Sequence, residues 1–380
     1  MARISSISVC AARVPLDRVT SFSTRTVRWR DYCLVKVRSA EGVEGIGFCY
    51  VGTAGASIAK LAVQELLAPL ILGQDSDQVE GLWEKMYREM ILHARTGTVM
   101  RAISILDIAI WDLNARAHNL PLYRHLGCWS VDKVPAYASG GYYLEGKTPK
   151  NLGEEVASYV RQGFRAVKIK VGRLSPQEEE ERVRAARETI GPDVHLMMDI
   201  NNAWADLPTA LLYCRRFEKY DPYWVEEPFS PDDIDNHAKL AAATSIPVAT
   251  GEIEAGRWRF KEILEKRAAE ILQNDAAVCG GISEWRRITQ TAASYSVTVC
   301  PHWFHDLHVH LVASAPNARY VEFFPDDQVL NFRRLINRQL EVQSGDLLLP
   351  RGPGLGFEFD ERAVIKYALS PAEAWVEIKQ

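Results

Sequence analysis

The sequence predicts an α/β protein whose larger domain is a barrel of parallel strands, each followed by a helix. Short apolar, strand-like runs alternate with helix-like segments from about residue 134 to 345. Seven of the runs end in a polar residue, and successive polar residues lie 29, 27, 26, 23, 27 and 20 positions apart. This interval suits one strand, one loop and one returning helix, so the polar residues should meet at one mouth of the barrel. They are Lys170, Asp199, Glu226, Glu252, Asp275, His302 and Glu322.

The length and composition indicate a two-domain globular protein that acts on a small molecule. A chain of 380 residues is too long for one ordinary core. Contents of 47% hydrophobic and 25% charged residues are ordinary for such proteins, and no run approaches the roughly 18 apolar residues that span a bilayer. The formal charge of -4 gives no general attraction for nucleic acid or anionic membranes. We therefore expect a small-molecule partner, no nucleic acid and no membrane.

The cysteines and the N-terminus favour the cytoplasm. The seven cysteines are scattered and include no C-x-x-C pair, so neither a disulfide framework nor a thiolate zinc site is expected. Arg13 interrupts the apolar start of the chain before the core of a secretory signal could form. We expect this segment to be a first strand instead.

The first third of the chain predicts a strand hairpin followed by helices. Strands are expected over residues 32–38 and 43–51, with a turn at 40–42. Asp75 and Ser76 can cap a helix whose apolar residues recur at helical spacing. These apolar residues are Val79, Leu82, Met86 and Met90. A second helix has apolar steps of 4, 3, 4 and 3 residues between Val99 and Leu113 and should end near Pro121.

Eight strand, loop and helix units are expected in the barrel, with parallel strands and no antiparallel hairpin. The strands begin near Val134, Ala166, His195, Tyr223, Pro247, Ile271, Val297 and Tyr320. Helices are expected over residues 150–163 and 176–190, the second opened by Ser175 and Pro176. The tail from about residue 346 contains no ninth unit and should fold back onto the N-terminal domain.

Asp199, Glu226 and Glu252 suit a hard divalent cation such as Mg²⁺. Such ions prefer carboxylate oxygens, and three protein acids leave positions open for oxygen atoms of a substrate. A single acid at a strand end more often faces solvent or caps a helix. Three acids at the ends of successive strands favour a metal site instead. Glu227 and Glu254 are less suitable, because neighbouring strand residues point to opposite faces.

Lys168 and Lys170 lie two positions apart and should share the interior face of one strand. Two neighbouring ammonium groups lower each other's pKa, and a nearby metal ion would do the same. One lysine is therefore expected to be a neutral amine near pH 7, which can act as a base. The alternative, a pair of surface lysines on an edge strand, does not fit a closed barrel.

Asp275 and His302 end neighbouring strands, a spacing that permits the carboxylate to hold one imidazole nitrogen. Such a pair can act as an acid or a base near neutral pH, on the side opposite Lys170. A lone histidine after a strand is more often a structural hydrogen-bond donor. Three further histidines raise the alternative of a zinc cluster, but no cysteine or H-E-x-x-H motif accompanies them. They are His305, His308 and His310.

The chain resembles the enolase superfamily, and specifically its mandelate racemase subgroup, in motifs that cover nearly its whole length. In order, the motifs are KIK, MMDIN, WVEEP, GE, QND, PH and VEF. The resemblance implies an α+β capping domain (1–127, completed by 346–380) and a modified TIM-type (β/α) barrel (128–345). It implies Mg²⁺ on the three acids, and Lys170 and the Asp275–His302 pair as the two acid/base groups. It also implies that Lys168 lies beside the substrate carboxylate, that Asn201 lies near the metal and that Glu322 donates to the intermediate.

The resemblance further implies removal of the proton α to a carboxylate through an enediolate intermediate. The expected reaction is dehydration of an acid sugar, an aldonate or aldarate, to a 2-keto-3-deoxy acid. Racemisation or epimerisation of a 2-hydroxy acid is the alternative, and cycloisomerisation is a distant one. Loops near residues 15–30 and 50–56 should cover the mouth, where inward arginines would suit a polyhydroxylated or dianionic substrate and outward ones would face solvent. The candidate substrate-binding residues are Arg25, Arg28, Arg30, Tyr50 and Asn201.

Two other functions are kept as distant alternatives. Residues 141–148 match the P-loop pattern G-x-x-x-x-G-K-[ST] after a strand. Glu145 and two tyrosines would crowd a loop whose amides must wrap phosphates, so we interpret the match as a coincidence. A non-catalytic scaffold would have lost a metal ligand or a base, and every one is present. The resemblance also implies a homo-oligomer.

Overall fold

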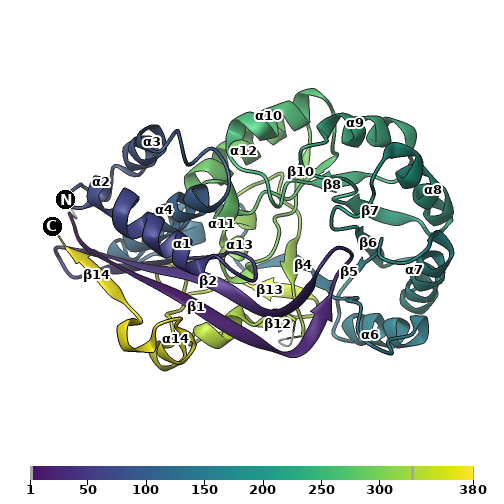
Figure 1. Cartoon of the computed structure of the whole chain (residues 1–380), viewed down its shortest axis with the longest axis horizontal. Coiled ribbons are helices and arrows are strands. Elements are labelled where there is room, and N and C mark those ends of the chain that lie inside the picture. The colour runs from purple at the N-terminus through teal and green to yellow at the C-terminus, as the bar shows by residue number, and fades with distance from the viewer. Residues whose placement is uncertain (1–2, 327–328, 380) are drawn as a thin grey trace.

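The structure, a computed structural model, describes residues 3–326 and 329–379 and shows an open sheet beside a closed barrel (Figure 1). The open sheet is antiparallel, in the order β14-β1-β2-β3. Its strands are β1 (Ile4–Ser21), β2 (Thr26–Ser39), β3 (Glu44–Tyr50) and β14 (Val376–Lys379). The predicted hairpin of β2 and β3 is confirmed, and pairing with β1 extends its first strand back to Thr26.

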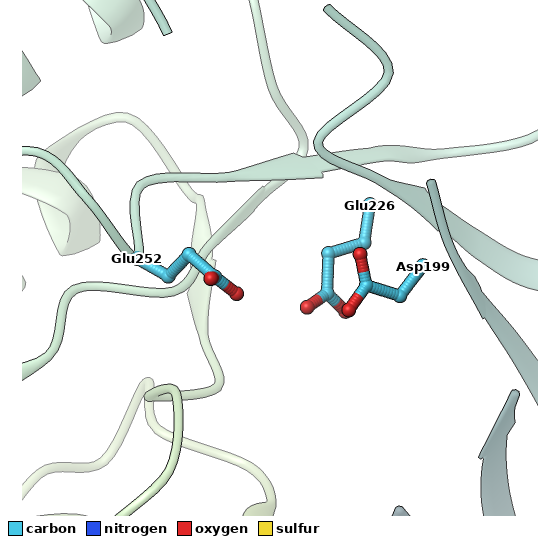
Figure 2. A group of neighbouring side chains, drawn as sticks. All are labelled: Asp199, Glu226 and Glu252. Carbon is cyan, nitrogen blue, oxygen red and sulfur yellow. The ribbon is translucent and has the colours of Figure 1, made fainter. Parts of the chain in front are cut away.

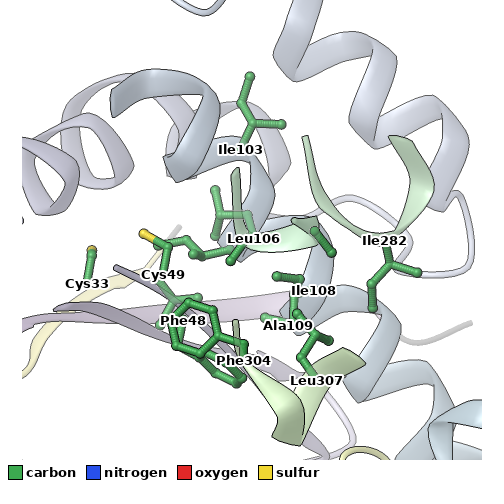
Figure 3. Packing of buried hydrophobic residues seen from close by; sticks show 14 of the residues in the cluster. Cys33, Phe48, Cys49, Ile103, Leu106, Ile108, Ala109, Ile282, Phe304 and Leu307 are labelled. Carbon is green, nitrogen blue, oxygen red and sulfur yellow. The ribbon is translucent and has the colours of Figure 1, made fainter. Parts of the chain in front are cut away.

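A group of helices follows in the N-terminal part. They are α1 (Ala56–Leu61), the π-helical η1 (Ala62–Leu67), α2 (Ala68–Ile71), α3 (Val79–Glu89), α4 (Thr98–Ala117) and α5 (Leu122–His125). Of these, α1 and α4 pack on the sheet, and α3 and α5 pack against α4. Gly47 of β3 permits a close approach of α4, since a Cβ atom there would lie 1.9 Å from the carbonyl oxygen of Ile105. Phe48, Leu106 and Ile282 belong to one hydrophobic core, which lies between the sheet, α4 and the barrel (Figure 3).

The predicted cap of α3 is wrong, although its apolar face is confirmed. The helix begins at Val79 after Gln78, and no side chain of the described residues caps it. Asp75 Oδ1 instead accepts a hydrogen bond of 3.1 Å from the backbone nitrogen of Asp77. The carboxylate of Asp75 therefore stabilises a turn that precedes the helix and does not cap the helix itself.

Eight parallel strands form the barrel, as predicted. The strands β4 to β10 pair in chain order, β11 pairs with β4, and a bridge between Val299 and Ala318 links β10 to the segment before β11. They are β4 (Lys133–Ser139), β5 (Ala166–Lys170), β6 (His195–Asp199), β7 (Pro222–Glu226), β8 (Val248–Thr250), β9 (Ile271–Leu272), β10 (Thr298–Val299) and β11 (Val321–Phe323). The predicted fold class, a modified TIM-type barrel with an N-terminal α+β domain, is confirmed.

Helices surround the ring of strands (Figure 1). They are α6 (Pro149–Arg161), α7 (Pro176–Ile190), α8 (Leu207–Phe217), α9 (Ile234–Ala243), α10 (Arg257–Glu265), α11 (Ala276–Cys279), α12 (Gly281–Ser294) and α13 (His305–Val312), with a 3-10 turn, η2 (Glu218–Tyr220). The predicted start of α7 is confirmed, because Ser175 is its N-cap and forms a capping box with Glu178. Within the described residues, no helix combines the length and the apolar character needed to cross a membrane.

The last part of the chain contains an antiparallel hairpin that the sequence did not predict. β12 (Val342–Gln343) pairs with β13 (Asp346–Leu348), and β13 pairs antiparallel with β4. Such short strands show no alternation that the sequence could reveal. The chain returns to the N-terminal sheet through α14 (Glu361–Tyr367) and β14, with 3-10 turns η3 (Phe332–Leu335) and η4 (Pro371–Glu373). The domain boundary expected at 345 and 346 falls inside the hairpin and stays a prediction.

The tip of the β1–β2 hairpin lies over the mouth of the barrel. Ser23 Oγ donates a hydrogen bond of 2.6 Å to the carbonyl oxygen of Val171, just after β5. Thr24 Oγ1 donates one of 3.2 Å to the carbonyl oxygen of Asn201, just after β6. The N-terminal domain therefore covers the strand ends that carry the predicted polar residues.

Candidate active site

The structure brings the seven polar residues together at the carboxyl ends of the barrel strands. Lys170 pairs in register with Asp199, and Asp199 with Glu226, across neighbouring strands. Their side chains therefore lie in one layer. Lys168 lies one layer deeper, since residues two apart on a strand share a face. Five of the seven are buried, and Glu252 and His302 are partly buried.

Asp199, Glu226 and Glu252 form a compact acidic cluster. One ligand oxygen from each lies within 4.8 Å of the others, and the carboxylates point toward one another (Figure 2). Across residues 3–326 and 329–379, this is the one group of three or more such side chains that could hold a metal ion. The three further histidines considered for zinc are not part of it. They are His305, His308 and His310.

The acidic cluster requires positive charge. Burial raises the pKa of Glu252 well above its ordinary value, and the carboxylates of Glu227, Asp199 and Glu226 raise it further. Burial and the Asp199 carboxylate likewise raise the pKa of Glu226. A divalent cation would remove this repulsion without protonating the acids, and carboxylate oxygens are the ligands that Mg²⁺ prefers. The residues present therefore fit Mg²⁺.

Both lysines of β5 are paired with carboxylates. Lys168 Nζ lies 2.6 Å from Glu226 Oε1 and 2.7 Å from Glu322 Oε1, and Lys170 Nζ donates to Asp199 Oδ2. Burial lowers the pKa of each lysine, but the carboxylates raise it by more, so both pKa values lie above the ordinary value. The expected neutral amine depends on a metal ion beside Asp199 and stays a prediction. A cation bound by Asp199 would compete with Lys170 for that carboxylate and lower the pKa of the lysine.

His302 lies between two carboxylates. Its Nδ1 lies 3.1 Å from Asp275 Oδ2, and its Nε2 lies 3.5 Å from Glu252 Oε2. His308 fixes the backbone on both sides of this pair, because its Nε2 accepts the N–H of Ala276 at 3.1 Å and its Nδ1 donates to the carbonyl oxygen of Trp303 at 2.9 Å. Burial lowers the pKa of His308, which favours the neutral ring that this acceptor role requires. The sequence pattern alone suggests only a zinc-ligand role for His308.

Both carboxylate oxygens of Glu322 have partners within the protein. Its Oε1 pairs with Lys168, and its Oε2 accepts the backbone N–H of Trp303 at 2.8 Å. Burial raises the pKa of Glu322, but Lys168, His302 and Lys170 lower it by more, to well below the ordinary value. The expected donor role toward the intermediate requires the protonated acid and stays a prediction.

Three of the five candidate substrate-binding residues lie at the mouth of the barrel. Asn201 Nδ2 donates a hydrogen bond of 3.0 Å to Asp199 Oδ2. Arg30 is buried, with its guanidinium over the rings of Tyr50 and Trp303. The other two candidates are exposed, so burial separates Arg30 from them. The exposed pair is Arg25 and Arg28.

Two tyrosines beside the lysines were missed by the sequence analysis. Lys168 Nζ lies 3.5 Å from the hydroxyl of Tyr137, and Lys170 Nζ lies 5.2 Å from the ring centre of Tyr142. Tyr137 lies two positions before the end of β4. The alternation of faces along that strand could therefore have indicated that Tyr137 points into the barrel. Tyr142 lies in a loop, where no periodic pattern applies.

The residues that match a P-loop connect β4 to α6, and their polar side chains are engaged within the protein. Lys147 Nζ pairs with Glu155 and donates to the carbonyl oxygen of Tyr142 at 2.9 Å. Thr148 Oγ1 accepts the backbone N–H of Asn151 at 3.3 Å and so caps α6. These contacts occupy the lysine and the hydroxyl that a P-loop offers to phosphate and metal.

Two family models match the chain and together cover most of it. One, described as Enolase C-terminal domain-like, matches residues 151–363. The other, described as Mandelate racemase / muconate lactonizing enzyme, N-terminal domain, matches residues 5–127.

The chain is also similar to curated proteins. It is 35% identical over 315 residues to arabinonate dehydratase from Saccharolobus solfataricus. This match covers 81% of this chain and 83% of that protein. It is 34% identical over 330 residues to L-talarate/galactarate dehydratase from Salmonella typhimurium. This match covers 87% of this chain and 81% of that protein.

Solved structures resemble the whole chain. The crystal structure of the Salmonella typhimurium LT2 enzyme has a TM-score of 0.91 at 30% identity and covers 100% of this chain and 94% of that chain. L-Talarate dehydratase from Polaromonas sp. JS666, complexed with Mg and L-glucarate, has a TM-score of 0.88 at 29% identity over 100% of both chains.

Proposed function

Because this chain belongs to the mandelate racemase and muconate lactonizing enzyme family of the enolase superfamily, we propose that it dehydrates an acid sugar to a 2-keto-3-deoxy acid with Mg²⁺. The observation that carries this proposal is the acidic cluster, flanked by Lys170 on one side and by His302 on the other. The names of the similar proteins, arabinonate dehydratase and L-talarate/galactarate dehydratase, support the choice of reaction.

Asp199, Glu226 and Glu252 would hold the Mg²⁺ ion. When bound, the ion supplies positive charge beside the substrate carboxylate and so makes the α proton more acidic. Lys168, which is fully buried and paired with Glu226 and Glu322, adds a fixed ammonium group to the same region. Preorganised positive charge of this kind stabilises the negative charge that develops on the substrate as the proton leaves.

Lys170 and His302 would act on the substrate from different sides. Lys170 ends β5 and His302 follows β10, and these strands are separated in the ring by β4 and β11 in one direction and by four strands in the other. Nζ of Lys170, as the neutral amine, takes the α proton, and the electron pair is held as an enediolate. This pair then forms the carbon–carbon double bond while the β-hydroxyl leaves. Nε2 of His302 protonates that hydroxyl, so water departs. The enol product then loses its O–H proton and gains one at carbon, which gives the 2-keto acid.

Racemisation or epimerisation of a 2-hydroxy acid is the second candidate. The placement of Lys170 and His302 on separate sides of the barrel favours it as well, since one group can remove the proton and the other can return it to the opposite face.

The proposal is tested by incubating the Mg²⁺-loaded protein with a library of aldonic, aldaric and uronic-derived acids. Release of a 2-keto acid from at least one member is the expected result. Silence across the library would overturn the dehydratase proposal. Proton NMR in deuterated water on the same samples would then show whether any acid exchanges its α proton without losing water, which is the outcome for a racemase.

We also propose that the protein works in the reducing cytoplasm. All seven cysteines are unpaired, and six of them are buried, which suits a compartment that keeps thiols reduced. The expected homo-oligomer stays a prediction, and light scattering on the purified protein measures it directly.

A further inference from the structure

Arg30 is a buried cation without an anionic partner. It is 3% exposed, and its Nε donates a hydrogen bond of 3.0 Å to the carbonyl oxygen of Val329. Its two terminal nitrogens form no hydrogen bond or ion pair with any side chain or backbone group in the described ranges, 3–326 and 329–379. Burial of an unpaired charge is costly, so a buried guanidinium of this kind usually serves a negatively charged partner.

Aromatic rings fix the position of this guanidinium. The carbon at its centre lies 4.5 Å from the ring centre of Trp303 and 5.2 Å from that of Tyr50. The two rings stack on each other with their centres 4.5 Å apart. Cation–π contacts hold the plane of the group but leave its N–H donors free to bind another molecule. Arg30 is therefore held rigidly, with donors still available.

The neighbours of Arg30 belong to the candidate active site. Trp303 directly follows His302, and its backbone N–H donates to Glu322. Burial raises the pKa of Tyr142, whereas Lys170 and Arg30 lower it, so the charge of Arg30 acts on the tyrosine that lies beside Lys170. Arg30 thus lies near both groups assigned to proton transfer.

The other cations near the mouth do not have these properties. Lys168 and Lys170 are neutralised by carboxylates. Arg25 and Arg28 are exposed. Arg30 differs from these four cations because it combines burial with terminal nitrogens that have no carboxylate partner among the described residues.

We propose that Arg30 binds the second carboxylate of the substrate, which makes this protein selective for aldarates, the dicarboxylic acid sugars, over aldonates. The inference rests on the proposed function, in which the first carboxylate lies at the acidic cluster. A second carboxylate can accept two N–H donors of a guanidinium in the bidentate manner. An aldonate carries a neutral hydroxymethyl group at that end and would leave the buried charge unpaired.

The test compares each aldarate with its aldonate, for example galactarate with galactonate, which differ only at carbon 6. Values of kcat/KM are measured for the wild type and for Arg30→Gln, Arg30→Lys and Arg38→Gln. Arg38 lies at the far end of β2 and pairs with Glu44 at the surface, so it is the matched control. We expect the wild type to prefer the aldarate. Arg30→Gln should lower kcat/KM for the aldarate by about 10- to 100-fold, mainly through KM, and change that for the aldonate by less than about threefold.

Each outcome decides one of the two proposals. If no acid releases a keto acid, the proposed function fails. If the wild type uses aldonates as well as or better than aldarates, the role of Arg30 is overturned and the dehydratase proposal stands. An equal loss on both substrates in Arg30→Gln would indicate a structural role and also overturns the inference. If Arg30→Gln does not fold, Arg30→Lys takes its place. This variant keeps the positive charge but loses the paired N–H donors of the guanidinium, so we expect it to retain part of the selectivity. The substrate preference of the wild type alone can still refute the proposal.

Discussion

Nδ1 of His302 lies 3.1 Å from Oδ2 of Asp275, and this contact leaves the other ring nitrogen of His302 on the side of the acidic cluster. The carboxylate keeps the proton of the ring on Nδ1 in the neutral form and stabilises the imidazolium when Nε2 takes a proton. An acid and base that works in this way depends on the charge of its partner more than on the partner's shape.

Asp275→Asn is therefore expected to lower kcat by about 10²- to 10⁴-fold with little loss of stability. Asp275 Oδ1 also caps α11 by accepting the backbone N–H of Ala277 at 2.8 Å, and an asparagine oxygen can do the same. Steady-state kinetics and thermal melting measure the two effects. The control is Asp233→Asn, which alters another helix cap and should keep its activity. Unchanged turnover in Asp275→Asn would contradict the role of the pair.

Lys170→Ala and His302→Asn should both abolish dehydration, because each removes one of the two proton-transfer groups. Exchange of the α proton in deuterated water should separate them, since His302→Asn keeps Lys170 and still exchanges this proton, whereas Lys170→Ala does not. Proton NMR follows the exchange. Lys261→Ala and His93→Asn change exposed residues of the same types and should behave as the wild type. Wild-type rates in both active-site variants would refute the two-group assignment.

Removal of Mg²⁺ should abolish turnover and lower the melting temperature. A ligand at a hundredfold excess over its Kd stabilises the folded state by about 2.7 kcal/mol, which a thermal melt detects as a shift of a few degrees. Glu252→Gln sharpens the test, because burial and three neighbouring carboxylates raise the pKa of Glu252. We expect this variant to lose the Mg²⁺-dependent shift while its metal-free form is at least as stable as the metal-free wild type. A metal-free variant less stable than the wild type would argue against repulsion in the cluster.

Asp107 of α4 should make stability depend on pH. Burial raises its pKa from 3.8 to about 7, although Ser283 donates two hydrogen bonds to it. The folded state therefore holds a proton that the unfolded state has lost, so the stabilisation is complete below pH 3.8 and is lost as the pH rises through about 7. Relative to Asp107→Asn, the wild type should lose roughly 2 to 3 kcal/mol of unfolding free energy between pH 5 and pH 8.

Chemical denaturation at the two pH values measures this difference. Asp193→Asn, which alters an exposed carboxylate, is the matched control and should show no comparable change between pH 5 and pH 8. If the wild type gains stability relative to Asp107→Asn between pH 5 and pH 8, the predicted direction of the pH dependence is wrong.

Local patterns predicted the elements of this fold well, and pairing between distant segments was predicted poorly. The apolar steps between Val99 and Leu113 predicted α4, and Ser175 with Pro176 predicted the start of α7, because both signals are complete within one helix. The hairpin of β12 and β13 was missed, and so was the pairing of β14 with β1. Short strands acquire their partners from other parts of the chain, which no local window contains.

The sequence by itself determined which chemical groups end the barrel strands, because one strand, loop and helix unit occupies a nearly constant length of chain. It therefore placed Asp199, Glu226 and Glu252 together with Lys170 and His302. Only the tertiary structure decided how these groups pair and which arginine is buried. Lys170 pairs with the carboxylate of Asp199 on the next strand, and Arg30 of β2 is buried whereas Arg28 is exposed. Electrostatic energies depend on distances and burial across strands, and a one-dimensional spacing contains neither quantity.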